Sequence, residues 1–452
     1  MEVQQKSEYD YQFIVKDLQR QYRLHEAIAF SKRCIQFNPK FPDFYWELTV
    51  TYITLLKWDS AIINCQKAVE LKPDYGPYYH TLGILLKIRN RIEEATFCFE
   101  KAVELESNNY QYYHHLGILL KLQGKSDEAL ASWEKEIVCH QQTIETNPNY
   151  YHSYYALGDV LQLKGQVNEG VKYYQKGIQI QKAINVMLIQ KAINVTLKLP
   201  DIEAVKKPNF IVIGTAKGGS TSLYSYLISH PRILPASTKE LAFFGEQFNS
   251  NGKTLEWYIN QFPSIPDRQK ITGEATPTYI THPLAAEQLF NLFPEVKLIV
   301  VLRNPIERTI SHYYDSLRGC AECRSLEKAA TSEIAVIEKM TESGLIEGNY
   351  WNRLGYISWS LYFYQLKMWM SIFPREQFLI LKSEDLFYHP EATMKLCFEF
   401  LGLPDYRLSE YRNFNPNSYP AIDNSIRQTL ADYFRPYNQK LEEYLDMEFN
   451  WE

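Results

Sequence analysis

The N-terminal third of the chain repeats its hydrophobic pattern every 34 residues. Tyr78 to Ser107 reads YYHTLGILLKIRNRIEEATFCFEKAVELES, and Tyr112 to Val138 reads YYHHLGILLKLQGKSDEALASWEKEIV. In this register, successive units hold leucine, glycine, alanine and a closing proline at fixed positions: Leu48, Leu82, Leu116 and Leu157; Gly83, Gly117 and Gly158; Ala27, Ala61, Ala95 and Ala129, with Gly170 in the fifth unit; Pro39, Pro73 and Pro148. Small residues let paired helices approach closely, so the spacing predicts a stack of helical hairpins.

The fourth unit is longer than the others, with seven extra residues before Pro148. Seven residues are about two helical turns, which predicts a longer second helix with an unchanged buried face. The pattern resembles the tetratricopeptide repeat, which has this period. Five units are readable from Glu8 to Ile180, so we expect residues 1–180 to form an all-α tetratricopeptide solenoid.

The repeated leucines and tyrosines are interpreted as packing residues, because core faces explain them fully. The concave surface of a helical solenoid is nevertheless a usual partner-binding surface. A peptide, a carrier protein and a second copy of the chain all remain open as partners.

A short duplication follows the repeats, since IQKAINV occurs at Ile180 to Val186 and again at Ile189 to Val195. A step of nine residues turns a helix by about half a circle, so the two copies would face opposite sides. We interpret residues 181–207 as a linker helix and assign it no function.

From Pro208 onward, short apolar strands alternate with helical sequence. FIVIGT, KLIVVLR and FLILKSEDL are of the buried-strand type, and each is followed by a helical pattern. This alternation predicts a parallel sheet with helices on both faces over residues 208–452. The chain is therefore expected to combine an all-α repeat domain with an α/β domain.

A glycine-rich turn follows the first of these strands, in NFIVIGTAKGGSTSLYSYLISHP from Asn209 to Pro231. The turn contains Lys217 and three glycines, namely Gly214, Gly218 and Gly219. Three hydroxyl residues, Ser220, Thr221 and Ser222, open the next helix. Glycine lets the backbone come close to a ligand, and helix N-termini attract anions. We therefore interpret the turn as a phosphate loop, with a plain strand-to-helix connection as the alternative. It departs from the Walker pattern, because Ser220 stands where the lysine belongs.

A second signature is VLRNPIERTISHYYDS, from Val301 to Ser316. Arg303 ends a strand, and Ser311 follows eight residues later on a helix. Ligands in such folds bind outside the carboxyl ends of strands, where both Lys217 and Arg303 would project. Arginine can clamp a phosphate bidentately, and a serine hydroxyl can complete the contact. Arg303 alone could be a surface ion-pair residue; beside the glycine loop, it indicates a second anion subsite.

Together, these signatures resemble the sulfotransferase superfamily that uses 3′-phosphoadenosine-5′-phosphosulfate (PAPS), in particular its heparan-sulfate and bacterial branch. The resemblance covers about Pro208 to Glu452 and implies a P-loop-like domain. It also implies the residues that hold the 5′-phosphosulfate, namely Lys217, Gly218, Gly219, Ser220, Thr221 and Ser222. Arg303 and Ser311 would hold the 3′-phosphate.

The same family has a Lys-Glu-x-x-Phe-Phe pattern whose glutamate is the general base. STKELAFFG, from Ser237 to Gly245, matches it and makes Glu240 the implied base. An acceptor hydroxyl must lose a proton as it attacks sulfur, and a positioned carboxylate can take that proton. Lys217 is expected to stabilise the charge that grows on the leaving phosphate oxygen.

Three positions depart from the heparan-type pattern. The histidine often found two residues after the glutamate is Ala242, and the lysine of the GEATPTY segment is Ala275. The cation common before the late Tyr-Pro is absent, because Asn417 and Ser418 stand there. The first two departures argue against a heparan-like acceptor, and the third weakens the expected grip on the 3′-phosphate.

Composition narrows the function classes. The formal net charge of -5 provides no global basic surface, which argues against a nucleic-acid partner. The sequence has no apolar run of 18 residues and no signal-peptide pattern at its start, so we expect a soluble, cytoplasmic protein without a membrane span. Cys320 and Cys323 form one CxxC, but zinc needs four ligands, so no metal is expected.

We predict that the chain transfers the sulfuryl group from PAPS to a hydroxyl acceptor by in-line, metal-independent transfer. The acceptor class stays open among a saccharide, a lipid, a carrier-bound metabolite and a protein tyrosine. Trp257, Tyr258, Tyr350 and Trp351 either line an acceptor cleft or pack in the core. The alternatives are a tetratricopeptide scaffold with a degenerate transferase domain and an ATP-dependent kinase.

Overall fold

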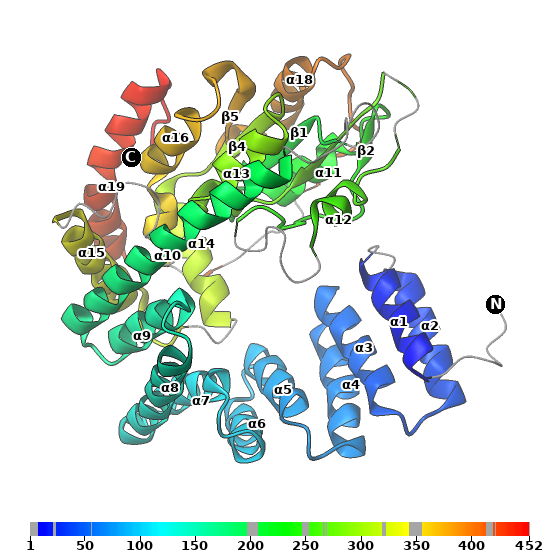
Figure 1. Cartoon of the computed structure of the whole chain (residues 1–452), viewed down its shortest axis with the longest axis vertical. Helices are drawn as coiled ribbons and strands as arrows, with labels where there is room; N and C mark the ends of the chain where they lie inside the picture. Colours follow the sequence, from blue (N-terminus) through cyan, green and yellow to red (C-terminus); the bar gives the residue numbers. More distant parts are fainter. Residues whose placement is uncertain are drawn as a thin grey trace. The chain divides into compact units, whose positions relative to one another are not determined.

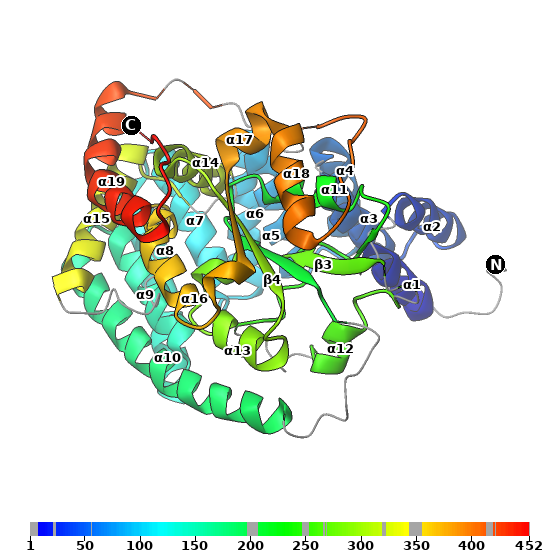
Figure 2. The ribbon, with the colours of Figure 1, turned by 90° about the horizontal axis from the view of Figure 1, so that it is seen from above.

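The chain divides into two compact units, which are described separately. The computed structural model describes residues 8–20, 24–55, 57–196, 207–245, 253–264, 267, 269–318, 322–342, 355–412, 419–420 and 422–451. The first unit comprises residues 1–166 together with residues 315–324, and the second comprises residues 167–314 and 325–452. Figures 1 and 2 show the elements of both units from two directions.

The first unit is a row of α-helices that pair in sequence order. Its helices are α1 (Glu8–Arg20), α2 (Leu24–Phe37), α3 (Pro42–Thr54), α4 (Trp58–Leu71), α5 (Gly76–Ile88), α6 (Ile92–Leu105), α7 (Tyr110–Leu122), α8 (Ser126–Thr146) and α9 (Tyr151–Leu163). Helix α8 has 21 residues, whereas its counterparts α4 and α6 have 14 each. The predicted all-α stack and its elongated fourth unit are therefore confirmed.

The repeated small residues allow the paired helices to touch. A Cβ atom on Gly83 of α5 would lie 2.9 Å from the Phe99 ring of α6, and one on Gly117 of α7 would lie 2.4 Å from Trp133 Nε1 of α8. Phe99 and Trp133 occupy the same position in successive repeats, and both are fully buried. Glycine is required at these two positions because an aromatic ring fills the space that a side chain would take.

Helix α10 (Val167–Thr196) runs without interruption and groups entirely with the second unit. There it packs against α13 (Ala285–Leu292) and α15 (Leu326–Glu342). The expected boundary at residue 180 falls inside this helix, and both copies of the duplicated heptapeptide lie within it. The division into residues 1–180, 181–207 and 208–452 stays a prediction.

The second unit is built on a five-stranded sheet in which all neighbouring strands are parallel. The strands are β1 (Phe210–Gly214), β2 (Ile233–Pro235), β3 (Ile271–Ala275), β4 (Lys297–Leu302) and β5 (Phe378–Lys382), in the order β2-β3-β1-β4-β5. The predicted parallel sheet is confirmed. From β1 the chain continues towards β2, and from β4 it continues towards β5, so the topological switch point lies between β1 and β4.

Helices cover both faces of this sheet, as Figure 2 shows. The remaining helices of the second unit are α11 (Ser220–Leu227), α12 (Leu255–Ile259), α14 (Pro305–Arg318), α16 (Tyr362–Met370), α17 (Ser383–Tyr388), α18 (Pro390–Leu401) and α19 (Asn424–Leu445), with short 3-10 turns at η1 (Tyr279–Thr281), η2 (Ser358–Ser360) and η3 (Arg375–Gln377). Residues 315–318 at the end of α14 group with the first unit.

The two faces of the sheet have separate cores. On β1, Ile211 and Ile213 belong to one apolar cluster with residues of α13 and α16, whereas Phe210 and Val212 belong to another with residues of α11 and α18. Alternate residues of a strand point to opposite faces, so a continuously apolar strand supplies both clusters. This is why the buried strands could be recognised from uninterrupted apolar runs.

Two partly buried histidines form a pair in the repeat unit. His80 Nε2 of α5 lies 2.8 Å from His115 Nδ1 of α7, and one ring must donate to the other. Burial lowers the pKa of His80 to about 4. Burial, with the neighbouring charges of His114, His80 and Lys87, lowers the pKa of His115 to about 2. Both rings are therefore neutral in the folded state at neutral pH.

This pair predicts that the repeat unit loses stability on acidification. In the unfolded chain both histidines take up a proton near pH 6.5, whereas the folded pair resists protonation, so the stabilisation is complete above that pH and declines below it. Each histidine is expected to contribute about 2 kcal/mol of destabilisation at pH 5. Urea unfolding followed by helical circular dichroism at pH 7 and pH 5 measures this loss.

The doubly substituted His80→Gln, His115→Gln chain should show a smaller decrease between the two pH values, because it lacks both titrating rings. His25→Gln, at an exposed position, should behave like the unsubstituted chain. An equal decrease in the double variant would contradict the assignment.

Candidate active site

The glycine-rich loop is anchored on the end of the neighbouring strand β4. The backbone N–H and the hydroxyl of Thr215 both donate to the carbonyl of Val301, at 3.0 and 2.8 Å. A Cβ atom on Gly218 would lie 2.5 Å from Thr215 Oγ1 and 2.7 Å from the Val301 carbonyl oxygen. Only glycine fits this position, so the loop sequence is dictated by close approach to β4.

The loop ends in the first turn of α11, which begins at Ser220. Gly219 precedes the helix with a φ of 101°, in the left-handed region that favours glycine. Ser220 and Ser222 are buried, whereas Thr221 is partly exposed. The first N–H groups of a helix have no acceptor within it, and here they follow directly on the loop that contains Lys217. This combination of exposed donors and a cation can bind an anion.

Arg303 lies beside this loop, as the sequence predicted. It follows β4, and its Nη1 donates to the carbonyl of Lys217 at 3.1 Å. Asn304 then begins α14, because its side-chain oxygen accepts the N–H of Ile306 at 2.9 Å. The guanidinium is thereby fixed next to the glycine loop, at the switch point of the sheet.

Ser311 lies two turns further along α14 and is 1% exposed. Within the described part of the chain, its hydroxyl oxygen has no hydrogen-bond partner. A buried hydroxyl without a partner is unfavourable and calls for an explanation, and a bound ligand is one.

Glu240 lies beside the carboxyl end of β3. Strand β3 is the neighbour of β1 on the side opposite β4. Its backbone N–H donates to the carbonyl of Ala275 at 3.0 Å, and its side chain, 54% exposed, forms an ion pair with Lys239. Its φ is 63°, and that of Ala242 is 48°. Two non-glycine residues in the left-handed region cost on the order of 1–3 kcal/mol each, so surrounding contacts must hold this loop.

A buried network that the sequence analysis missed provides those contacts. The carboxylate of Glu274, fully buried on β3, accepts hydrogen bonds from Tyr258 (2.8 Å), Tyr279 (3.2 Å) and Thr276 (2.6 Å). The hydroxyl of Tyr279 accepts the N–H of Phe243 at 2.8 Å. The loop that carries Glu240 is therefore fastened to residues of the GEATPTY segment.

Burial raises the pKa of Glu274, and hydrogen bonds from Thr276, Tyr258 and Tyr279 oppose the rise. Tyr258 is fully buried in this network, so it is a core residue rather than part of an acceptor cleft. Tyr350 and Trp351 lie outside the described residues. The signal in the sequence that could have revealed this network was a glutamate within a buried strand, followed closely by two hydroxyl residues.

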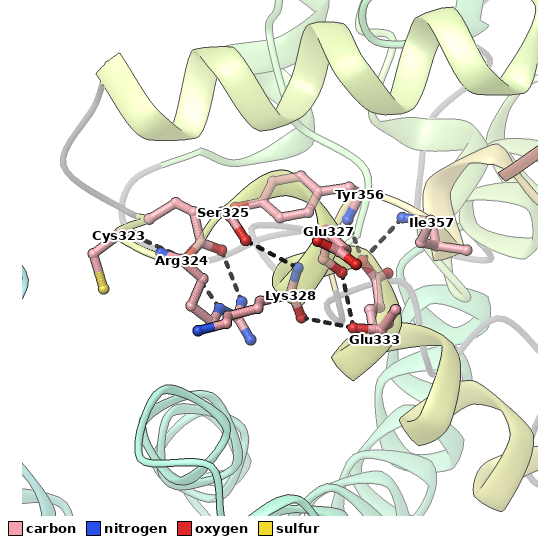
Figure 3. A network of polar contacts seen from close by, with 10 residues as sticks. Cys323, Arg324, Ser325, Glu327, Lys328, Glu333, Tyr356 and Ile357 are labelled. Carbon is pink, nitrogen blue, oxygen red and sulfur yellow. Dashed lines mark hydrogen bonds and ion pairs between the residues drawn. The ribbon is translucent and has the colours of Figure 1, made fainter. Parts of the chain in front are cut away.

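A second buried network fixes the segment that follows residue 354 (Figure 3). The carboxylate of Glu333 on α15 accepts the backbone N–H groups of Tyr356, Ile357 and Ser358 at 2.7, 3.0 and 2.9 Å. Arg308 on α14 donates to the carbonyl of Tyr356 and, at 2.6 Å, to the hydroxyl of Ser360.

Burial lowers the pKa of Arg308 to about 10, so its guanidinium stays charged at neutral pH. Two buried charges of opposite sign thus bind the same short segment, one through its N–H groups and one through a carbonyl. Their effect is to fasten α14, with Ser311 one turn after Arg308, and α15 to the same segment.

Comparison with known proteins identifies the family to which the chain belongs. The family model described as a sulfotransferase domain matches residues 207–435, just over half of the chain. The chain belongs to the sulfotransferase family. Models of the tetratricopeptide repeat match residues 76–109, 98–131 and 151–184 in the first part.

Individual relatives cover only part of the chain. The membrane-associated sulfotransferase kil1 of Dictyostelium discoideum is 29% identical over 316 residues, which are 54% of this chain and 66% of that protein. Human heparan sulfate glucosamine 3-O-sulfotransferase 5 is 29% identical over 54% of this chain and 74% of its own length. A sulfotransferase structure from Alicyclobacillus acidocaldarius is 25% identical and covers 54% of this chain and 97% of that chain, with a TM-score of 0.43.

Two further properties concern possible membrane spans and metal sites among the described residues. None of the helices there is long and apolar enough to cross a membrane. Within the same residues, no three His, Cys, Asp or Glu side chains are grouped so that they could hold a metal ion. Cys320 of the CxxC pair lies outside the described residues. A cytoplasmic location stays a prediction, and the name of kil1 describes that relative as membrane-associated.

The network around Glu274 predicts a specific cost for removing one hydroxyl. Tyr279→Phe keeps the ring but leaves the buried N–H of Phe243 and the carboxylate of Glu274 each without one partner. We expect a loss of about 1–3 kcal/mol in stability, measured as a lower thermal unfolding midpoint of the second unit. Tyr388→Phe, at a side chain that is 80% exposed, is the matched control and should leave the midpoint unchanged. Equal midpoints for both variants would show that the network contributes nothing to stability.

Proposed function

We propose that this chain transfers the sulfuryl group of PAPS to a hydroxyl acceptor by in-line displacement without a metal ion. The observation that carries the proposal is the contact between Arg303 and the glycine loop in a sulfotransferase domain. Ser311, on the helix that follows Arg303, supports it with a buried hydroxyl oxygen that has no partner among the described residues. The glycine loop follows β1 and Arg303 follows β4, so both flank the switch point of the parallel sheet, where ligands of such folds bind.

The residues present fit such a donor. The loop of Lys217, Gly218 and Gly219, with the N–H groups of Ser220, Thr221 and Ser222, offers donors for the 5′-phosphosulfate. Arg303 offers a guanidinium, and Ser311 a buried hydroxyl oxygen without a partner among the described residues, for the 3′-phosphate. When bound, PAPS supplies the sulfuryl group and leaves as adenosine 3′,5′-bisphosphate.

Two side chains would handle the charges of the transfer. Glu240 accepts the proton of the acceptor hydroxyl while its oxygen forms a bond to sulfur. The bond between sulfur and the bridging phosphate oxygen breaks, and Lys217 stabilises the negative charge on that oxygen. As in phosphoryl transfer, positioning and charge stabilisation supply the catalysis. The sulfuryl group carries less charge than a terminal phosphate, so the proposal requires no metal.

The acceptor is proposed only as a hydroxyl-bearing compound, with a saccharide, a lipid, a carrier-bound metabolite and a protein tyrosine as its classes. Several relatives are named for action on heparan sulfate. Ala242 and Ala275 stand where the heparan-type pattern has histidine and lysine, and the net charge of -5 does not favour a polyanionic chain. The repeat unit is proposed to bind a protein partner or a second copy of the chain.

Replacing the proposed base tests the mechanism. Glu240→Gln removes the proton acceptor but keeps the size of the side chain, so turnover of a hydroxyl acceptor with PAPS should decrease by about 10²–10⁴-fold. The affinity for adenosine 3′,5′-bisphosphate, measured by calorimetric titration, should change by less than about twofold. Glu256→Gln, at an exposed position of α12, is the control. Full activity of the Glu240 variant would contradict its role as the base.

Ser311 allows a test of the donor that needs no acceptor. Ser311→Ala should weaken the binding of adenosine 3′,5′-bisphosphate by roughly tenfold, because a hydrogen bond to a charged phosphate is lost. Binding of adenosine 5′-monophosphate, which lacks the 3′-phosphate, should not change. Ser316→Ala on the same helix is the matched control.

The same titrations separate the alternative functions. Bisphosphate binding should persist when divalent ions are chelated. Binding of ATP that requires magnesium, without binding of the bisphosphate, would indicate a kinase. Binding of the bisphosphate without turnover of any acceptor would indicate a scaffold with a degenerate transferase domain.

A further inference from the structure

A short piece of the C-terminal sequence belongs to the repeat unit. Residues 315–324 lie between α14 and α15 along the chain, yet they group with residues 1–166. The described end of this piece is the tripeptide Glu322–Arg324, in which Glu322 is 1% exposed. Figure 3 shows Cys323 and Arg324 of this tripeptide, ahead of the helix that contains Glu327 and Lys328.

The tripeptide compensates its own charge. The carboxylate of Glu322 accepts the backbone N–H groups of Cys323 and Arg324, both at 2.8 Å, and the guanidinium of Arg324 through Nε and Nη2 at 3.0 and 2.7 Å. Burial alone would raise the pKa of Glu322, but these donors outweigh it and hold the pKa below its usual range. A carboxylate can be buried in this way because its lone pairs are satisfied locally.

The tripeptide lies against equivalent positions of two successive repeats. Cys323 packs against the apolar core of the repeats, and its thiol has a pKa raised to about 12 by burial, so it is a neutral, small apolar group. Lys87 of α5 and Lys121 of α7, the two repeat cations that act on this thiol, stand 34 residues apart. Residues one period apart lie on the same face of a stack of repeats.

The pKa of His114 on α7 is affected by the charge of the tripeptide's carboxylate. The Nδ1 atom of His114 lies 3.0 and 3.1 Å from the carboxylate oxygens of Glu136 on α8. Burial alone would lower the pKa of His114, but Glu136, Asp159 of α9 and Glu322 of the tripeptide raise it. The repeat side chains that act on the tripeptide, or are acted on by it, therefore come from α5 and α7, the first helices of two successive repeats.

We propose that the face formed by α5 and α7 is a peptide-binding site, and that Glu322–Arg324 of the same chain is its resident ligand. The site takes a carboxylate near His114 followed by a small apolar side chain near Lys87 and Lys121. A protein partner that presents this pattern must displace the resident tripeptide. The tether gives that tripeptide a high effective concentration, so it inhibits partner binding from within the chain. This inference is independent of the reaction proposed above.

The test supplies the ligand in trans. A fluorescent peptide of residues 315–327 is titrated with the full chain, and binding is followed by anisotropy. The unsubstituted chain should bind weakly, because its site is filled. Cys323→Arg places a bulky cation beside two lysines and should release the resident segment, so that the peptide binds at least tenfold more tightly. Cys323→Ala, which still fits the apolar site, is the matched control and should bind as weakly as the unsubstituted chain.

Two further reagents make the result decisive. Cys323→Arg and Glu322→Lys are called release variants, because each should free the resident segment from the repeats. Glu322→Lys does so independently, by placing a cation near His114, and its position lies outside the helices of the repeats. A peptide that itself carries Cys323→Arg should not bind either release variant. The proposal is overturned if folded release variants, checked by circular dichroism, bind the peptide no better than the unsubstituted chain. It is also overturned if the substituted peptide binds equally well.

Discussion

The carbonyl of Val301 is the point on which the candidate active site depends. It accepts both hydrogen bonds of Thr215 and so pins the glycine loop to the end of β4. Two residues later, Arg303 reaches back and donates to the carbonyl of Lys217. One strand end therefore positions both the loop that would hold one phosphate and the cation that would hold the other. The absence of a side chain on Gly218 makes this contact possible, since any Cβ atom there would overlap the carbonyl.

Buried charges hold the elements around this point without forming direct ion pairs with one another. Glu274 is satisfied by hydroxyl groups and keeps the strained loop of Glu240 at the end of β3. Glu333 and Arg308 are satisfied by the backbone and side chains of one short segment and keep α14 in place. Removing a hydrogen-bond partner from such a buried charge lowers the stability of the fold, because a desolvated charge would remain without compensation. They act here as positioning residues for Glu240 and Ser311.

The repeat unit is held together differently, because glycines on one helix leave space for aromatic rings of the next helix. Gly83 and Gly117 make room for Phe99 and Trp133, and this contact recurs with the period of the sequence. The same periodicity places Lys87 and Lys121 on one face, near the tripeptide that the other part of the sequence supplies. Helix α14, which carries Ser311, ends at Arg318, and its residues 315–318 group with the repeat unit.

The sequence alone determined the features that depend on local spacing. The period of 34 residues identified the helical repeats and their elongated fourth unit, and uninterrupted apolar runs identified β1, β4 and β5. Glycines after a strand, with an arginine after another strand, indicated the sulfotransferase domain. The sequence pattern did not reveal β2, because this strand is only three residues long. It did not reveal β3, because this strand contains glycine, threonine and glutamate.

Only the tertiary structure decided which polar groups meet. Glu274 with Tyr258, Glu333 with Tyr356, and Cys323 with the apolar core of the repeats are contacts between segments far apart in the chain or in different elements. No local period encodes such pairings, because they result from how strands and helices pack. The sequence could therefore name candidate ligand-binding residues, whereas the residues that hold them in place became visible only in the fold.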